Sequence, residues 1–300
     1  MKCSRCKEHA VVALPSHHAG FCKPCFLLFF KNQVQRSIKK MKLLEPEDRV
    51  LVAISGGKDS LALTWQLKDL GYDVTGLHID LGIGRSSLLA RQYTETFCRK
   101  HDIALHVLET AAEGLAMPEV KKRIRRPICS VCGSVKRHYF NRFAVENGFT
   151  ALATGHNLND EVSRLFSNVL SWDQDYLSGQ SPLLPGENGF AKKVKPLYRL
   201  SEFETANFCF MQGIEYGYHP CPFSKGATFT FYKSLWEELE AEQPGRRISF
   251  YEGYLKKGRA AFEALKRQRE TTLAACTSCG FPSSADLCVV CRIKSQMQDA

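Results

Sequence analysis

Short apolar runs alternate with longer segments of helical periodicity through the middle of the chain. A short apolar run between turn-forming residues predicts a strand, whereas apolar positions spaced three and four apart predict a helix. We predict strands at 49–54, 74–79, 104–108 and 150–154. Helices are predicted at 59–70, 86–101 and 130–147, with another after Asn157. This alternation predicts the α/β class, with a doubly wound parallel sheet.

The segments outside this alternation differ in character. Residues 31–45 have the pattern of a basic amphipathic helix. Residues 171–195 combine Gly, Pro, Ser and Asp with little periodicity, which predicts a loop near the site. Further helices are predicted at 202–213, 233–242 and 252–270.

Three polar segments fall where predicted strands end. They are Ser55–Ser60, His78–Asp80 and Gly155–Asp160. In doubly wound sheets, ligands bind beyond the carboxyl ends of the strands, where the topology switches. We therefore expect these three segments to share one site.

The segment Ser55–Ser60 reads Ser-Gly-Gly-Lys-Asp-Ser between a predicted strand and a predicted helix. Gly56 and Gly57 allow the backbone to approach an anion, and the helix N-terminus points N–H groups at it. The segment matches neither the Walker pattern nor Gly-x-Gly-x-x-Gly. An ordinary strand-to-helix turn is the alternative. The string resembles the pyrophosphate loop (PP loop) of ATP pyrophosphatases, which split ATP into AMP and pyrophosphate.

Length and charge narrow the class of protein. The chain has 300 residues, 44% of them hydrophobic, and a formal net charge of +10. This size allows one large core or two modest ones, and the charge favours nucleic acid as a partner over a merely basic surface. The basic run 121–126 immediately precedes Cys129 and suits an RNA backbone, with a solvated charged face as the alternative. No apolar run is long enough for a membrane span and no secretory signal is evident, so we expect a cytoplasmic protein.

Thirteen cysteines are unusual for a protein of a reducing compartment, where metal binding is expected before disulfides. Eight of them form two sets of paired Cys-x-x-Cys turns, each suited to a four-thiolate zinc site, with redox pairs as the alternative. The sets are Cys3, Cys6, Cys22 and Cys25, and Cys276, Cys279, Cys288 and Cys291. His17 and His18 lie inside the first set and are expected to be exposed loop residues, because four sulfurs already close the site.

Five cysteines remain outside these sets. Cys98 and Cys209 lie in predicted helices and suit small buried positions. Cys129, Cys132 and Cys221 could instead bind a metal centre with one coordination position open. The alternatives are a third zinc site completed by His219, or a disulfide-forming or persulfide-carrying pair.

Four motifs follow one another along the chain between the two four-cysteine sets. They are the PP-loop string, Pro127–Gly133 (Pro-Ile-Cys-Ser-Val-Cys-Gly), Thr154–Asn157 (Thr-Gly-His-Asn) and His219–Pro222 (His-Pro-Cys-Pro). Together they resemble the tRNA 2-thiolation enzymes of the TtuA/TtcA type. The flanking sets make the chain more similar to the TtuA-like 2-thiouridine and 2-thiothymidine branch than to the 2-thiocytidine branch, and the resemblance covers nearly the whole chain.

The resemblance implies a reaction in which the C2 carbonyl oxygen of a tRNA base is adenylated and then replaced by sulfur. It implies ATP, Mg²⁺, a [4Fe-4S] cluster on Cys129, Cys132 and Cys221, and two Zn²⁺. Lys136 would neutralise charge, and Asp160 would serve as general acid or base or would orient the base. The implied nucleotide-binding residues are Ala53, Ser55, Gly56, Gly57, Lys58, Asp59, Ser60, His78, Ile79 and Gly155. Relatives often show paired acids after Gly-His-Asn, and here Asn159 takes one of those positions.

The implied organisation is an N-terminal zinc ribbon at 1–30, a PP-loop domain at 31–271 and a C-terminal zinc ribbon at 272–300. The implied partners are tRNA and a sulfur donor, which is a thiocarboxylated ubiquitin-like carrier, a persulfide or sulfide, with a homodimer plausible from the family. Two rival functions share some of these features. An amidating PP-loop ligase acting on a small carboxylate gives no role to the three unpaired cysteines, and a non-catalytic zinc-ribbon nucleic-acid-binding protein would show no tRNA-dependent turnover of ATP.

Overall fold

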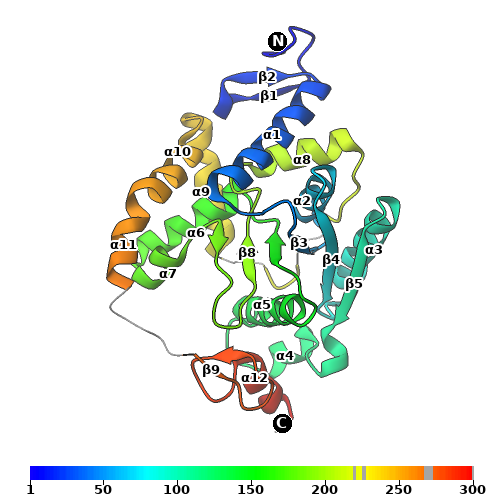
Figure 1. Cartoon of the computed structure of the whole chain (residues 1–300), viewed down its shortest axis with the longest axis vertical. Helices are drawn as coiled ribbons and strands as arrows, with labels where there is room; N and C mark the ends of the chain where they lie inside the picture. The colour runs from blue at the N-terminus through cyan, green and yellow to red at the C-terminus, as the bar shows by residue number, and fades with distance from the viewer. Residues whose placement is uncertain (219–220, 225–227, 267–272, 299–300) are drawn as a thin grey trace.

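A six-stranded sheet lies at the centre of the computed structural model, which describes residues 1–218, 221–224, 228–266 and 273–298 (Figure 1). The strands stand in the order β5-β4-β3-β6-β8-β7, and all neighbours are parallel except β7 and β8. Their bounds are β3 Arg49–Ala53, β4 Asp73–Asp80, β5 Ala104–Glu109, β6 Ala151–Thr154, β7 Leu183–Leu184 and β8 Lys192–Val194. The chain starts in the middle of the sheet and adds strands on both sides, so the predicted doubly wound arrangement is confirmed.

Successive residues of β3 enter different cores, as the two faces of a strand require. Val50 and Val52 are buried in a cluster with residues of α1 (Lys23–Met41), α2 (Lys58–Asp69), α3 (Gly84–Lys100) and α8 (Glu202–Gln212). Leu51 is buried in a separate cluster with Ala144 of α5 (Ile128–Glu146). Both faces of the sheet are therefore covered, which explains why its central strands are continuously apolar.

A second helical layer packs beside this sheet. Leu158 and Val162 of α6 share a buried cluster with Trp236 and Tyr251 from later helices. The helices of this part are α6 Leu158–Leu170, α7 Gln174–Gly179, α9 Thr228–Glu242, α10 Arg246–Gly253 and α11 Arg259–Lys266, with the π-helical turn η3 Tyr254–Gly258 between the last two. This layer places α6 and α9 side by side near the carboxyl end of β6.

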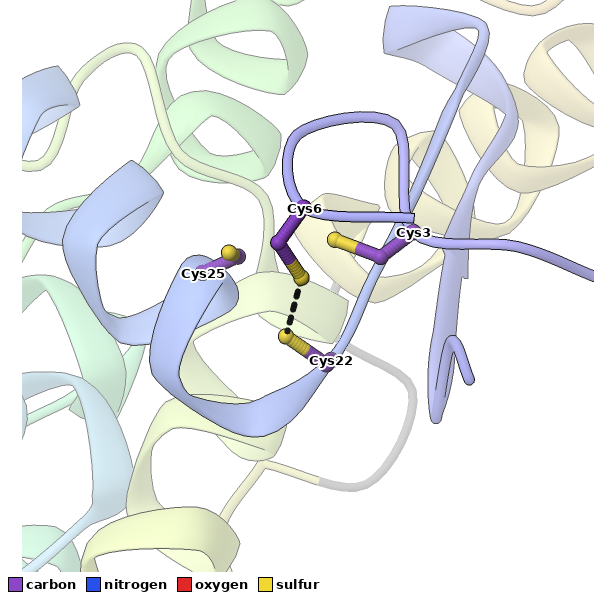
Figure 2. Close-up of side chains that lie close together, drawn as sticks. All are labelled: Cys3, Cys6, Cys22 and Cys25. Atoms are coloured by element: carbon purple, nitrogen blue, oxygen red, sulfur yellow. Dashed lines mark hydrogen bonds between the residues drawn. The ribbon is translucent and has the colours of Figure 1, made fainter. Parts of the chain in front are cut away.

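The two cysteine-rich ends lie at opposite ends of the molecule (Figure 1). The first contains β1 Val12–Leu14, η1 Pro15–His17 and β2 Ala19–Phe21, and the second contains β9 Ala274–Ala275, β10 Pro282–Ser283 and α12 Val289–Gln298. In each, the four predicted sulfurs lie within 4.8 Å of one another, and Figure 2 shows those of the first set converging on one point. The predicted pairing of Cys-x-x-Cys turns into two four-sulfur sets is therefore confirmed.

The C-terminal set packs against helix α5. Cys276, Cys288 and Cys291 are buried in the same cluster as Val131 and Val135 of α5. That cluster also includes Met117 and Val120 of α4 (Met117–Arg123), which follows η2 (Thr110–Glu113). This end of the chain therefore supports the helix that carries Cys129 and Cys132.

Three predicted elements differ from the structure. The helix predicted at 31–45 begins at Lys23 and ends at Met41, where Lys42 adopts a left-handed conformation. Residues 171–195 are not a loop throughout, because they contain α7, β7 and β8. The helix predicted at 252–270 is divided by η3, and its last four residues lie outside the described ranges. Within those ranges, no helix has the length and apolar character needed to cross a membrane.

Candidate active site

The PP loop lies between β3 and α2, and its shape depends on two glycines. Gly56 has a φ of +77°, and a Cβ there would lie 2.5 Å from the carbonyl oxygen of Ala90. A Cβ on Gly155, at the end of β6, would lie 2.8 Å from the backbone nitrogen of Ser60. Gly155 therefore allows the third polar segment to contact the loop directly, as expected from the strand ends.

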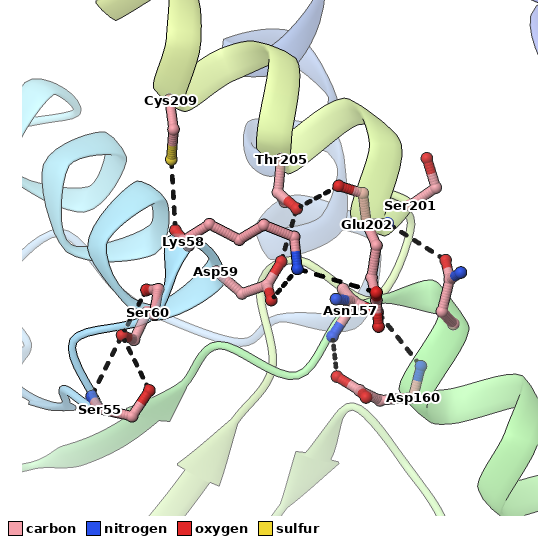
Figure 3. A network of polar contacts seen from close by, with 12 residues as sticks. Ser55, Lys58, Asp59, Ser60, Asn157, Asp160, Ser201, Glu202, Thr205 and Cys209 are labelled. Atoms are coloured by element: carbon pink, nitrogen blue, oxygen red, sulfur yellow. Dashed lines mark hydrogen bonds and ion pairs between the residues drawn. The ribbon is translucent and has the colours of Figure 1, made fainter. Parts of the chain in front are cut away.

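Hydroxyl groups hold the loop closed from within. The backbone N–H of Ser55 donates to Ser60 Oγ at 3.1 Å, and Ser60 Oγ donates to the carbonyl oxygen of Gly57 at 2.9 Å (Figure 3). Such a preformed turn at a helix N-terminus suits a phosphate group. On its outer side, the carbonyl oxygen of Gly56 accepts a hydrogen bond from the N–H of Gly217 at 2.9 Å. The segment that leads to Cys221 is therefore attached to the PP loop.

Charged side chains connect the PP loop to α8. Lys58 Nζ lies 3.0 Å from Asp59 Oδ2 and 3.8 Å from Glu202 Oε2, and Thr205 Oγ1 donates to Asp59 Oδ1 at 2.5 Å (Figure 3). Burial alone would lower the pKa of Lys58, but the charges of Asp59 and Glu202 outweigh burial and raise the pKa above its usual value. Lys58 is therefore a firmly charged group beside the predicted phosphate site.

Asp160 lies in the first turn of α6 and is held by two partners. Its Oδ2 accepts from the backbone N–H of Asn157 at 3.1 Å, within a capping box, and its Oδ1 lies 2.6 Å from Lys233 Nζ. Lys233 also pairs with Glu202. Burial would raise the pKa of Asp160, but the charge of Lys233 outweighs it, so the pKa lies below its usual value. The carboxyl group is therefore ionised, which suits a base better than an acid.

Asn159, which takes a position where the resemblance implied an acid, has a structural role. Its side-chain N–H donates to Glu237 at 2.7 Å, and its side-chain oxygen accepts from the backbone N–H of Glu202 at 3.2 Å. The residue is buried and joins α6 to α8 and α9. The acidic position that faces Lys233 belongs to Asp160.

The predicted nucleoside-flanking residues line the ends of β3 and β4. His78 is buried, and its Nδ1 lies 2.9 Å from the carbonyl oxygen of Ile54. Burial lowers the pKa of His78, so the ring is neutral. Its Nε2 is also buried and has no hydrogen-bond partner within the part of the chain that the structure describes. Ile79 is buried beside it, and Ala53 is half-buried.

The three remaining predicted ligands, Cys129, Cys132 and Cys221, form what we call the cysteine site. Burial raises the pKa of Cys132, Lys136 opposes that increase, and Cys221 and Cys129 add to it, so all these groups lie within electrostatic range of Cys132. Cys129 Sγ lies 3.6 Å from the carbonyl oxygen of Phe223, two residues beyond Cys221. The structure thus brings together both segments that carry the cysteine site.

The cysteine site is wider than the two terminal sets. Among the described residues, only those terminal sets have all ligand atoms within 4.8 Å of one another. A single tetrahedral zinc with Zn–S bonds of about 2.3 Å places its sulfurs about 3.8 Å apart. The distances of 3.4 Å between the sulfurs of Cys6 and Cys22, and 3.7 Å between those of Cys279 and Cys288, fit that geometry. His219, the other ligand considered for a third zinc site, lies outside the described residues.

Sequence reasoning did not identify the residues of α8 and α9 that complete the site. Thr205 contacts Asp59 and Lys233 contacts Asp160, although each pair lies far apart in the sequence. Glu202 pairs with both Lys58 and Lys233. The capping box Ser201-x-x-Glu204 marks the start of α8 and was readable in the sequence. No local pattern, however, indicates which loop that helix start would face.

Comparison with known proteins agrees with this geometry. Residues 30–220 match the family model of the PP-loop domain, and residues 2–27 match that of the N-terminal LIM domain of the 2-thiouridine synthetase TtuA. The chain is 41% identical to a tRNA-5-methyluridine(54) 2-sulfurtransferase of Pyrococcus horikoshii, with 97% of this chain and 93% of that protein covered. It is 40% identical to the protein of the same name from Thermus thermophilus, with 98% and 91% covered.

A solved structure is similar along the whole length. It is the U34-tRNA thiolase NcsA from Methanococcus maripaludis with its [4Fe-4S] cluster, with a TM-score of 0.80, 26% identity and coverage of 97% of this chain and 95% of that one. The PP loop, the terminal cysteine sets and the extent of these similarities lead to one conclusion. The chain belongs to the PP-loop family, and within it to the TtuA-type tRNA 2-sulfurtransferases.

Proposed function

We propose that this protein uses ATP to replace the C2 carbonyl oxygen of 5-methyluridine 54 in tRNA with sulfur. The observation that carries the proposal is the hydrogen bond from Gly217 to Gly56, because it attaches the Cys221 segment to the PP loop. Position 54 is favoured because the relatives named for that position are 38–41% identical, whereas the U34 thiolase is 26% identical.

The PP loop would bind the phosphates of ATP, with Asp59 suited to Mg²⁺. The nearby neutral ring of His78 offers Nε2 as an acceptor for an adenine amine, if Nδ1–H donates to Ile54. This assignment would give the buried nitrogen the partner that it otherwise lacks. Ala53 and Ile79 would then flank the nucleoside.

The base must lose its N3 proton when its C2 oxygen attacks the α-phosphorus of ATP and displaces pyrophosphate. The ionised carboxylate of Asp160 suits acceptance of that proton. A sulfur nucleophile then adds to C2, the C2–O bond breaks, and AMP leaves with the original carbonyl oxygen. Lys136, which lies within electrostatic range of Cys132, would stabilise the developing negative charge.

The donor set at the cysteine site fits an iron–sulfur cluster, because three thiols converge without the compact spacing of a single ion. Such a cluster would supply an iron with one open position for the incoming sulfide. The terminal sets fit Zn²⁺, one ion each. We also propose the division into ribbons at 1–30 and 272–300 around a PP-loop domain at 31–271.

The test is an anaerobic assay with reconstituted protein, ATP and Mg²⁺, in which sulfide and ammonium are supplied together as competing nucleophiles. The substrates are matched tRNA transcripts that carry or lack the 5-methyl group at position 54, and the products are measured by nucleoside mass spectrometry. We expect 2-thio-5-methyluridine together with one AMP per thiolated base. Thiolation of uridine 34 instead would refute the position, and incorporation of ammonia instead of sulfur would favour the amidating ligase.

The remaining partners can be tested in the same assay. A thiocarboxylated carrier, a persulfide and free sulfide are supplied separately at equal sulfur concentration, and the physiological donor is the one with the highest kcat/KM. We also propose that the protein is a homodimer, as the resemblance implies, and sedimentation of the holoprotein tests this.

A further inference from the structure

Three cationic side chains that have no carboxylate partner among the described residues belong to elements around the cysteine site, and Arg137 and Arg164 are exposed while Lys193 is half-buried. We call Arg137 of α5, Arg164 of α6 and Lys193 of β8 the cation cluster. Arg164 and Lys193 both lie within electrostatic range of Arg137. No ion pair in the described ranges includes any of the three, although Arg142 on the same helix pairs with Glu146 at 2.7 Å.

Arg137 is directed toward the cysteine site by the helix that carries it. Its Nη1 lies 3.1 Å from the point where a Cβ on Gly133 would stand, and its Nη2 donates to Ser134 Oγ at 3.2 Å. The guanidinium group therefore folds back along α5 over Gly133, the residue after Cys132. A larger side chain at Gly133 would force it away.

Arg164 connects the cation cluster to the surroundings of Asp160, because Arg164 and Lys233 contact the same aromatic ring. The guanidinium carbon of Arg164 lies 5.1 Å from the ring centre of Phe229, and Lys233 Nζ lies 5.3 Å from the same centre. Lys233 is the residue that pairs with Asp160. The cation cluster therefore adjoins both the cysteine site and the proposed base.

We propose that the cation cluster binds a backbone phosphate of the tRNA next to the nucleotide whose base enters the site. This inference rests on the proposed function. The planar forks of two arginines match phosphate oxygens, and an anion would relieve the repulsion among three unpaired cations. Tyr176, which is 68% exposed and within electrostatic range of Arg137, offers a ring on which a neighbouring base can stack.

The half-buried position of Lys193 favours an anion beside it. Burial lowers the pKa of Lys193, and the charge of Arg137 lowers it further. Both effects disfavour a cation unless an anion offsets them. An enzyme that draws one base out of a folded RNA must also hold the adjacent backbone, and a phosphate site beside the base pocket would do so.

The first experiment compares Arg137→Gln with the matched control Arg142→Gln, which changes an arginine of the same helix outside the cation cluster. Binding of the T-arm RNA to the holoprotein is measured by fluorescence anisotropy over a range of salt concentrations. Arg137→Gln should weaken RNA binding about tenfold and reduce the salt slope by about 1. The ATP affinity of Arg137→Gln, measured separately without RNA, should be unchanged. The control Arg142→Gln should keep both its RNA binding and its ATP affinity.

The second experiment removes the charge from the RNA. One methylphosphonate replaces the phosphate on the 5′ or 3′ side of nucleotide 54. One of the two substitutions should weaken binding to the unchanged protein about tenfold but have little further effect on Arg137→Gln, because the same contact is already lost. The inference is overturned if each methylphosphonate weakens RNA binding equally in the unchanged protein and in Arg137→Gln. The visible absorption of the iron–sulfur cluster is recorded in parallel. This outcome counts against the inference even if Arg137→Gln disturbs the iron–sulfur cluster.

The remaining outcomes separate this inference from the proposed function. A loss of ATP affinity in Arg137→Gln, with RNA binding intact, would assign the cation cluster to the nucleotide phosphates and overturn the inference. If the unchanged protein thiolates tRNA but the salt slope of Arg137→Gln is unaltered, only the inference fails. If the unchanged protein neither binds nor thiolates tRNA, both fail.

Discussion

The terminal cysteine sets and the cysteine site use the same side chain in two arrangements. In each terminal set, four sulfurs from two nearby turns lie within 4.8 Å of one another. The cysteine site combines two cysteines of one helix with a third from a distant segment, and it does not reach that spacing. Four sulfurs complete the coordination of an ion, whereas three leave a position for a reactant. The difference in sulfur number and spacing is the reason why we propose a structural role for the terminal sets and a reactive role for the cysteine site.

The surroundings of the two kinds of site also differ, because the C-terminal set is buried among apolar residues whereas the cysteine site lies among charged ones. The C-terminal set is embedded in the apolar cluster that supports α5. The cysteine site lies beside Lys136 and the cation cluster, and its Cys129 is exposed. A structural ion needs shielding, whereas a reactive centre must admit its substrate.

The largest expected effect comes from Cys132→Ser. Removing one of three ligands should reduce thiolation on the order of 10³-fold or more, because residues that act as a unit fail together. Visible absorption of the anaerobic protein should also disappear, while the zinc content stays at two ions per chain. Full thiolation by this variant would show that the two arrangements do not differ in function.

Asp59→Asn should affect the nucleotide step alone. We expect AMP formation to fall about 10²- to 10³-fold, since a carboxylate beside the phosphates is lost, while visible absorption remains. Asp69→Asn, at the other end of α2, is the control and should retain activity. If Asp59→Asn lost the visible absorption of the iron–sulfur cluster, the PP loop and the cysteine site would depend on each other structurally.

Cys276→Ser should act on stability more than on chemistry. The zinc content should fall from two to one, and a loss of about 2 kcal/mol would lower Tm by roughly 4–8 °C. Thiolation per folded molecule should stay within a few-fold of the unchanged protein at low temperature. Circular dichroism shows whether the variant is folded. If folded Cys276→Ser lost as much thiolation activity as Cys132→Ser, the proposed difference between the terminal sets and the cysteine site would be contradicted.

The smallest effect is expected from Lys233→Met. The ion pair with Lys233 keeps the pKa of Asp160 low against the opposing effect of burial, so its removal should raise that pKa. Because the ionised carboxylate is the active form, activity is lost as pH falls through this pKa, and the variant should lose it at higher pH. The acid limb of kcat/KM against pH measures the shift, and an unmoved limb would exclude Asp160 as the base.

The central part of the fold was predictable because its signals are local. Val50, Leu51 and Val52 form a continuous apolar run that ends at two glycines, and the predicted strand and helix follow within one residue of the structure. Residues 171–195 were not predictable in this way. Strand β8 has only three residues, two of them lysines, and it exists because Leu152 and Lys193 pair across the sheet.

The site was predictable to a similar extent. The PP loop, Cys129, Cys132 and Gly155 belong to short motifs with a local mechanism, and the structure brings their segments together. Glu202 and Lys233 have no such motif, because their contacts depend on how α8 and α9 pack against α2 and α6. The π-helical turn at Tyr254–Gly258 likewise has no clear signal in a segment of helical periodicity.

The central claim is that the cysteine site delivers the sulfur that enters the base. The most direct measurement loads anaerobic holoprotein with isotopically heavy sulfide, removes free sulfide by desalting, and then adds ATP and 5-methyluridine-containing tRNA for a single turnover. Mass spectrometry of the nucleosides should find the heavy isotope in 2-thio-5-methyluridine, close to one per active chain, and none with Cys221→Ser. Thiolated product without the label, or equal labelling by Cys221→Ser, would contradict the account.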